Sequence, residues 1–267
     1  MANRIDAERA FVLAPHTDDG ELGCGGTISR LLEEGVDVYY VAFSTCRTSL
    51  PEGWAPDTLE KELRAAALRL GIRADRLIVF DFEVRHFDRA RQEILEQLVD
   101  LKRTLAPDLV FLPCPQDMHQ DHVVIATEGI RAYKQCTVLA YELPWNNITF
   151  STQCFIALEE RHVVRKAEAV RCYTSQQDRP YADPAFIHGL ARTRGVESGH
   201  RYAEAFQVIR WNIACAPAPA AESCEPERLG EAGLLDGLQP ACAGKGERPR
   251  RSVPVLVRSE EGLECLP

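Results

Sequence analysis

Two kinds of segment alternate up to residue 144, and this alternation constrains the fold more than any other feature of the sequence. Short apolar runs, rich in β-branched and aromatic residues, have the length of buried strands. Between them lie amphipathic stretches whose apolar residues recur every three or four positions, as on one face of a helix. The predicted strands are 11–15, 36–44, 77–82, 108–114 and 137–143, and the predicted helices are 27–34, 59–71, 90–105 and 122–134. Strands joined by helical crossovers favour an α/β fold with a mostly parallel sheet and helices on both faces.

The sequence after residue 144 is less regular but shows no linker. Residues 159–174 and 183–194 have helical patterns, and residues 202–211 have the pattern of a last strand. We therefore predict a single domain over residues 1–214.

The composition changes at Cys215. Seven of the sixteen prolines lie in the last 53 residues, among Gly, Ala and charged side chains without periodicity. Such a segment cannot easily bury a core, so we predict that residues 215–267 form a largely disordered tail. Residues 252–257 could form one short strand, and the basic run 246–251 leaves a docking role open.

Charge and hydropathy exclude several classes of protein. The net charge of −9 argues against a nucleic-acid partner, because binding phosphates requires a basic surface. The first ten residues lack the apolar stretch of a signal peptide, and the longest apolar runs, such as 38–43, are too short to cross a bilayer. We expect a soluble, cytoplasmic protein whose ten cysteines, lacking any C-x-x-C pair, are free thiols.

Side chains that could bind a metal follow the first and the fourth predicted strands. His16, Asp18 and Asp19 follow the first strand, and Asp117, His119, Asp121 and His122 follow the fourth. A further polar candidate, Arg47, follows the second strand. Ligands bind beyond the carboxyl ends of parallel strands, where the loops after strands one and four are often neighbours. Two histidines and a carboxylate are a typical zinc set, and a second carboxylate could take a proton from water.

Each of these features also has a plainer explanation. An H-x-x-H pair occurs by chance, adjacent aspartates often cap a helix, and the glycines of residues 20–26 could allow a tight turn. The glycines could instead cradle a phosphate. However, the dinucleotide fingerprint is absent, there is no Walker lysine, and Asp18 and Asp19 would repel a pyrophosphate. A metal site is therefore favoured over a nucleotide site.

Three segments resemble one known family. HTDDGELGCGG (16–26) closely resembles the H-P-D-D-E-x-L-G-x-G-G motif of the PIG-L/LmbE-type zinc-dependent N-deacetylases. HQDH (119–122) resembles that family's H-x-D-H motif, and residues 194–206 resemble its closing segment. The resemblance covers roughly residues 8–212 and implies a Rossmann-like fold.

The resemblance implies a role for each candidate residue. His16, Asp19 and His122 would bind Zn²⁺, although another divalent transition metal would also fit. Asp18 would be the general base, and a charged His119 would stabilise the oxyanion or protonate the leaving amine. Asp121 would orient or tune a histidine.

The sequence also departs from the family pattern. Thr17 replaces a proline, Gly20 replaces a glutamate while Glu21 follows it, and Leu59 replaces an arginine three residues before Glu62. That arginine resembles a contact to sugar hydroxyls, for which Arg47 is a candidate substitute in substrate binding.

The resemblance implies a hydrolase that removes an N-acetyl group from an N-acetylglucosamine-type conjugate, such as a glycan, a glycolipid or a thiol precursor. The alternative is a catalytically inactive sugar-binding protein on the same scaffold. The expected partner is a small amino-sugar substrate, to which Trp145 and two neighbouring asparagines could bind, unless they form a packed loop. The identity of the sugar stays open, and a homo-oligomer is compatible with the sequence.

Overall fold

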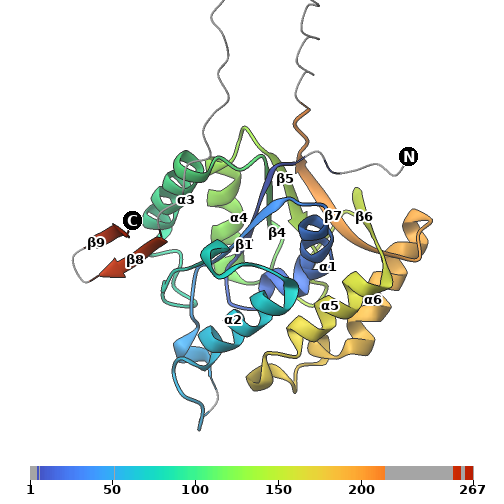
Figure 1. The fold of residues 1–267 in the computed structure, drawn as a ribbon, viewed down its shortest axis with the longest axis horizontal. Coiled ribbons are helices and arrows are strands. Elements are labelled where there is room, and N and C mark those ends of the chain that lie inside the picture. The colour runs from blue at the N-terminus through green and yellow to red at the C-terminus, as the bar shows by residue number, and fades with distance from the viewer. Residues whose placement is uncertain (1–4, 6, 51, 214–254, 260–261, 267) are drawn as a thin grey trace, which may run out of the picture. The chain divides into compact units, whose positions relative to one another are not determined.

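A seven-stranded sheet lies at the centre of residues 1–213 in the computed structural model, which describes residues 5, 7–50, 52–213, 255–259 and 262–266 (Figure 1). The strands are β1 (Arg9–Ala14), β2 (Asp37–Ala42), β3 (Leu77–Val79), β4 (Leu109–Pro113), β5 (Thr137–Tyr141), β6 (Cys154–Leu158) and β7 (Tyr202–Arg210). The helices are α1 (Asp19–Glu33), α2 (Thr58–Leu70), α3 (Arg91–Leu105), α4 (Gln120–Ala132), α5 (Glu160–Val170) and α6 (Pro184–Ser198). Four short 3₁₀ turns, η1 (Arg47–Ser49), η2 (Ala74–Arg76), η3 (Thr174–Gln176) and η4 (Pro180–Ala182), complete this part.

The sheet order is β3-β2-β1-β4-β5-β7-β6. Strands β1 to β5 pair in parallel, whereas β7 runs antiparallel to both β5 and β6. The predicted α/β fold with a mostly parallel sheet is therefore confirmed. The strand order reverses between β1 and β4, which places the loops after these two strands side by side.

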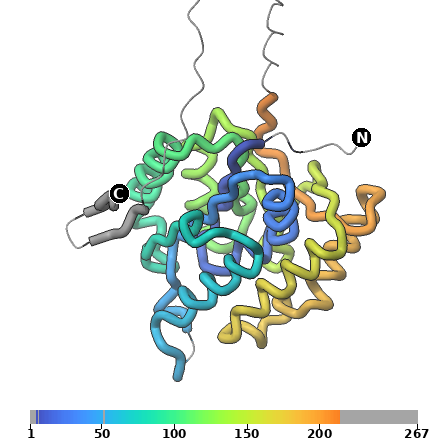
Figure 2. The backbone as a smooth tube through the Cα atoms, viewed as in Figure 1, coloured from blue at the N-terminus to red at the C-terminus, as the bar shows by residue number. Residues whose placement is uncertain are grey.

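Helices cover both faces of the sheet, as predicted (Figures 1 and 2). Helices α3 and α4 pack on one face, and α1, α2, α5 and α6 pack on the other, so each face has its own apolar core. Helix α2 shows how the sequence produces this arrangement. Its buried Leu59, Leu63, Ala66 and Leu70 recur at helical spacing, and Gly71 ends it with a φ of +99°.

Helix α1 begins eight residues before the predicted start at residue 27, and its φ/ψ angles are non-helical at Cys24. Glycines disfavour a helix, which is why the pattern did not reveal this turn. They are explained by close packing. A Cβ atom on Gly23 would lie 2.3 Å from the Tyr141 ring, and one on Gly26 would lie 2.5 Å from Leu158. These two glycines let α1 approach the sheet.

Strand β6 was not predicted. It lies at the edge of the sheet beside β7, and only two residues of its short stretch are buried. It is followed almost directly by α5, so neither a turn signal nor an alternating pattern marks it. Among the helices that the structure describes, none has the length and apolar character needed to cross a bilayer.

Within the predicted tail, the structure describes two strands, β8 (Val255–Ser259) and β9 (Gly262–Leu266). They pair antiparallel as a hairpin, and β8 overlaps the short strand predicted at 252–257. The prediction of disorder for the rest of the tail concerns residues outside the described part of the chain.

Candidate metal centre

Six of the seven predicted site residues meet at the carboxyl ends of β1 and β4. His16 lies two residues beyond β1, and Asp18 and Asp19 lie at the start of α1. His119 is the N-cap of α4, and Asp121 and His122 lie in its first turn. The two histidine rings of positions 16 and 122 have centroids only 5.1 Å apart, although 106 residues separate them in sequence.

Three potential ligand atoms form a nearly equilateral triangle. The Nδ1 of His16 lies 3.1 Å from Oδ2 of Asp19 and 3.2 Å from Nε2 of His122, which in turn lies 3.2 Å from the same Oδ2. Ligands of a tetrahedral zinc ion, each bound at about 2.0–2.1 Å, are about 3.3–3.4 Å apart. The nitrogen and oxygen donors also have the chemistry that zinc selects, so the residues present fit such an ion.

The outer nitrogen of each of these two histidines faces a carboxylate. His16 donates from Nε2 to Oδ2 of Asp121 at 3.1 Å, and His122 donates from Nδ1 to Oδ2 of Asp117 at 2.9 Å. A proton on the outer nitrogen leaves the inner nitrogen free to bind a cation, and it also fixes the ring orientation. Asp121 also accepts hydrogen bonds from the backbone N–H groups of Arg85 and Phe87, which hold it in place.

His119 differs from the other two histidines. The three rings lie close enough that one nitrogen from each could share an ion. However, Nδ1 of His119 accepts a hydrogen bond from the backbone N–H of Asp121 at 3.2 Å, so the ring proton resides on Nε2. With this tautomer, Nε2 of His119 is a hydrogen-bond donor.

The charge expected on His119 is not supported by its surroundings. Burial, together with the neighbouring His16 and His122, lowers the pKa of His119 to about 4. The imidazole is thus neutral at pH 7, and a bound cation would lower its pKa further.

Carboxylates draw positive charge into the centre of the site. Burial opposes protonation of His122, but Asp19 and Asp117 outweigh it and raise its pKa to about 10. The pKa of His16 is also raised, because the hydrogen bonds to Asp121 and Asp19 outweigh burial. Burial would raise the pKa of Asp19, yet His122 and His16 hold it well below its usual range. The site therefore attracts protons in the absence of a divalent cation.

Asp18 is not used as a helix cap. It occupies the N-cap position of α1, but its side chain makes no capping hydrogen bond. Asp19 makes a local contact instead, accepting from the backbone N–H of His16 at 2.8 Å. Burial and the adjacent Asp19 raise the pKa of Asp18 to about 6, which suits a group that takes up and releases a proton.

Arg47 is not part of the cluster. Its half-exposed side chain contacts Asp81 at 3.3 Å and Thr45 at 3.2 Å, which ties it to the ends of β2 and β3. Leu59, in the place of the family's arginine, is buried in the core. Glu62 accepts hydrogen bonds from Thr174 and Ser175 and so anchors the segment after α5.

Two acidic residues have roles that the sequence did not reveal. Asp117, which stood among the loop residues without a role, orients His122 and also accepts from the backbone N–H of His119. Glu21 contacts the hydroxyls of Tyr40 and Tyr173 rather than the histidines. Burial raises the pKa of Glu21 to about 8, so it is neutral at pH 7 and supports the loop.

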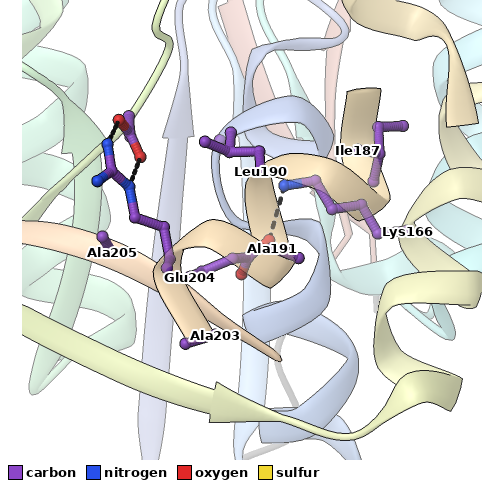
Figure 3. Close-up of a pocket in the computed structure, with 10 residues that line it drawn as sticks. Lys166, Ile187, Leu190, Ala191, Ala203, Glu204 and Ala205 are labelled. Carbon is purple, nitrogen blue, oxygen red and sulfur yellow. Dashed lines mark hydrogen bonds and ion pairs between the residues drawn. The ribbon is translucent and has the colours of Figure 1, made fainter. Parts of the chain in front are cut away.

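The backbone of the glycine-rich segment donates hydrogen bonds to a carboxylate side chain of the same chain. The N–H groups of Gly26 and Thr27 donate to Glu204 at 3.0 and 2.7 Å, and Lys166 contacts the same carboxylate at 2.7 Å. Figure 3 shows this pair in a small pocket lined on one side by Ile187, Leu190 and Ala191. Because Glu204 occupies these donors, the segment is no phosphate cradle, and the pocket shares no residue with the histidine cluster.

Comparison with known proteins places this geometry in context. Residues 11–133 match the profile of the family described as PIG-L: GlcNAc-PI de-N-acetylase. The chain is 26% identical to a diacetylchitobiose deacetylase of Thermococcus kodakarensis over 229 residues, which cover 76% of this chain and 84% of that protein.

Two solved structures share the fold. An N,N′-diacetylchitobiose deacetylase from Pyrococcus horikoshii superposes with a TM-score of 0.64 at 22% identity, covering 76% of this chain and 84% of that one. The 4-carboxy-2-hydroxymuconate hydratase of Pseudomonas putida superposes with a TM-score of 0.67 at 21% identity, covering 79% and 100%. The fold thus hosts more than one reaction, and the chemistry must be argued from the site.

Proposed function

Because residues 11–133 carry a PIG-L family domain, we propose that this chain is a zinc-dependent hydrolase that removes an N-acetyl group from an N-acetylglucosamine-type sugar conjugate. The diacetylchitobiose deacetylase to which it is similar supports this class of substrate. The proposed metal ligands are His16, Asp19 and His122, and the proposed general base is Asp18.

One observation carries the proposal. Three inward-facing donor atoms lie 3.1–3.2 Å apart, two of them on imidazoles whose outer nitrogens face carboxylates. Converging nitrogen and oxygen donors, with the outer imidazole nitrogens held by carboxylates, are typical of a zinc site.

The chain's own residues would handle the protons of the reaction. A bound zinc ion would act as a Lewis acid and lower the pKa of water toward about 7. Asp18 takes a proton from the attacking water as the water oxygen bonds to the amide carbon. The Nε2–H of neutral His119 donates to the oxygen on which negative charge develops. Asp18 then returns its proton to the amine nitrogen as the C–N bond breaks, which yields acetic acid and the free amine.

An assay for acetate release, run with zinc on a panel of N-acetylglucosamine conjugates, tests the proposal. Mass spectrometry of the same reactions should show the loss of one acetyl group from an accepted substrate. No release from any member of the panel would favour the inactive sugar-binding protein instead.

The Asp18→Asn variant tests the base. We expect its turnover to fall at least about 100-fold, because general base catalysis contributes on that order. Its bound zinc should stay at the wild-type level, as measured by elemental analysis. Wild-type turnover in this variant would show that Asp18 is not the base.

A further inference from the structure

The loop after β5 is attached to the loop that carries the metal-site residues after β4. The backbone N–H of Met118 donates to Asn146 at 2.9 Å, and that of Ile148 donates to Gln116 at 2.8 Å. The Asn147 amide also lies 3.4 Å from Oδ2 of Asp117, the carboxylate that orients His122. These contacts hold Trp145, in the middle of the β5 loop, beside the candidate site.

A second segment also contacts the candidate site. The hydroxyl of Tyr173 donates to the carbonyl of Thr17, the residue before Asp18, at 2.7 Å. Glu62 fixes the next residues by accepting from Thr174 at 2.7 Å and from Ser175 at 2.6 Å. Tyr181 lies on η4, at the end of this anchored segment.

The two segments meet through their aromatic rings. Trp145 and Tyr181 stack with centroids 4.1 Å apart and planes 10° apart, and Phe186 contacts the indole edge-on at 5.9 Å. Both stacked rings stay partly exposed. Such a pair is rigid, and each partner carries a polar group as well as an apolar face, which is the chemistry that suits a sugar ring.

The hydroxyl of Tyr181 is available to a ligand. It makes no hydrogen bond to any residue in the described part of the chain, whereas the hydroxyls of Tyr40, Tyr133, Tyr141 and Tyr173 all do. Burial and the nearby charges of Asp18 and Asp19 raise the pKa of Tyr181 to about 12, so the phenol keeps its proton.

We infer that Trp145 and Tyr181 form the sugar-binding wall of the candidate site, where Tyr181 donates a hydrogen bond to an oxygen of an N-acetylated amino sugar. Trp145 is a positioning residue that holds the phenol ring. This inference rests on the proposed function, since the sugar it binds is the proposed substrate, but its binding step can be measured without turnover.

Steady-state kinetics on N,N′-diacetylchitobiose test the two residues. Tyr181→Phe keeps the stack and removes only the hydroxyl, so KM should rise about 3- to 10-fold while kcat changes little. Trp145→Ala should raise KM in the same way, and Trp145→Phe should restore part of the loss. Trp211→Phe is the matched control, because Trp211 is exposed and follows Arg210, which pairs with Val138 near the start of β5, at the end of the parallel strands opposite to the site.

Fluorescence measures the binding step separately. The chain has three tryptophans, so Trp54→Phe with Trp211→Phe leaves Trp145 as the sole reporter. In this background, with Asp18→Asn to stop turnover, titration with N,N′-diacetylchitobiose should change the emission saturably. Adding Tyr181→Phe should raise Kd about 3- to 10-fold.

The two proposals fail in different ways. An unchanged KM and Kd in Tyr181→Phe, or an emission that does not respond to the sugar, would contradict the proposed sugar-binding wall. This holds even if the wild type releases acetate. If the protein binds the sugar saturably, Tyr181→Phe weakens that binding and no acetate is released, the sugar-binding wall is supported and the deacetylase activity is contradicted.

Discussion

Hydrogen-bond partners divide three similar imidazoles into two kinds. His16 and His122 face carboxylates with their outer nitrogens, whereas His119 receives a backbone N–H. An H-x-x-H pattern alone cannot make this distinction, because the tautomer depends on the groups that the fold brings to each ring.

Metal binding should depend on pH through the protons that the ion displaces. The pKa of His122, raised to about 10, keeps that imidazole protonated in the metal-free protein at pH 7, and the pKa of His16 is also raised. Zinc binding therefore releases protons, and its affinity should rise as the pH rises toward about 10, the pKa of His122. Calorimetry at pH 7 in two buffers of different ionisation enthalpy would reveal the released protons. Equal heats in both buffers would contradict this expectation.

Asp117 should matter to the metal although it does not touch it. Asp117→Ala removes the acceptor that fixes the His122 ring, and zinc affinity should fall about 10- to 100-fold. Competition with a chelator of known affinity measures the change. The control is Asp75→Ala, because Asp75 lies in η2, before the start of β3, where it pairs with Arg73 and Arg76, and its loss should leave the affinity unchanged.

The sequence predicted which residues gather at the site better than what each of them does. Six of the seven candidates follow strands one and four, and the adjacency of those strands follows from a doubly wound sheet. Arg47 follows strand two, and its contact with Asp81 depends on where β3 ends, which no local pattern specifies. The roles of Asp117 and the neutral state of His119 depend on contacts across loops.

At the scale of elements, helix α1 shows how a fold overrides local propensity. Its first eight residues include four glycines, and the φ/ψ angles of Cys24 among them are non-helical. Glu204 on β7 compensates by accepting hydrogen bonds from the N–H groups after the kink, and Lys166 on α5 pairs with its carboxylate. A pairing between residues 178 positions apart cannot be predicted from periodicity.

Gly23 provides a test of close packing. Gly23→Ala would place a Cβ atom 2.3 Å from the Tyr141 ring, and overpacking of this kind costs about 1–3 kcal/mol in the free energy of unfolding. Gly189→Ala on α6 is the matched control, since it meets nothing within 4 Å and should stabilise by about 0.5–1 kcal/mol. Denaturant unfolding of both variants gives the comparison. Equal stabilities would show that α1 can move away from the sheet.

At the scale of the whole molecule, residues 1–213 contain the seven-stranded sheet, both apolar cores and the candidate metal centre. The alternation of strands and helices predicted this architecture, because each crossover requires a parallel neighbour. The last strand was predicted at 202–211, but neither β6 nor the antiparallel direction of β7 followed from the alternation.

A chain ending at Ile213 should therefore fold and bind zinc as the full chain does. We expect its free energy of unfolding to lie within about 1 kcal/mol of the full-length value, because both cores are kept. Thermal unfolding and zinc titration of the two chains would measure this. A large loss of stability would show that residues 214–267 contribute to the folded state.

The separation of His16 and His122 by 106 residues has a consequence for folding itself. An ion bound by both histidines would act as a cross-link that closes a long loop. Such a cross-link reduces the conformational entropy of the unfolded chain most when the loop is long. By mass action, every increase in free zinc would then favour the native state. The concentration of the metal would thus set how much of the protein stays folded, besides how fast it turns over.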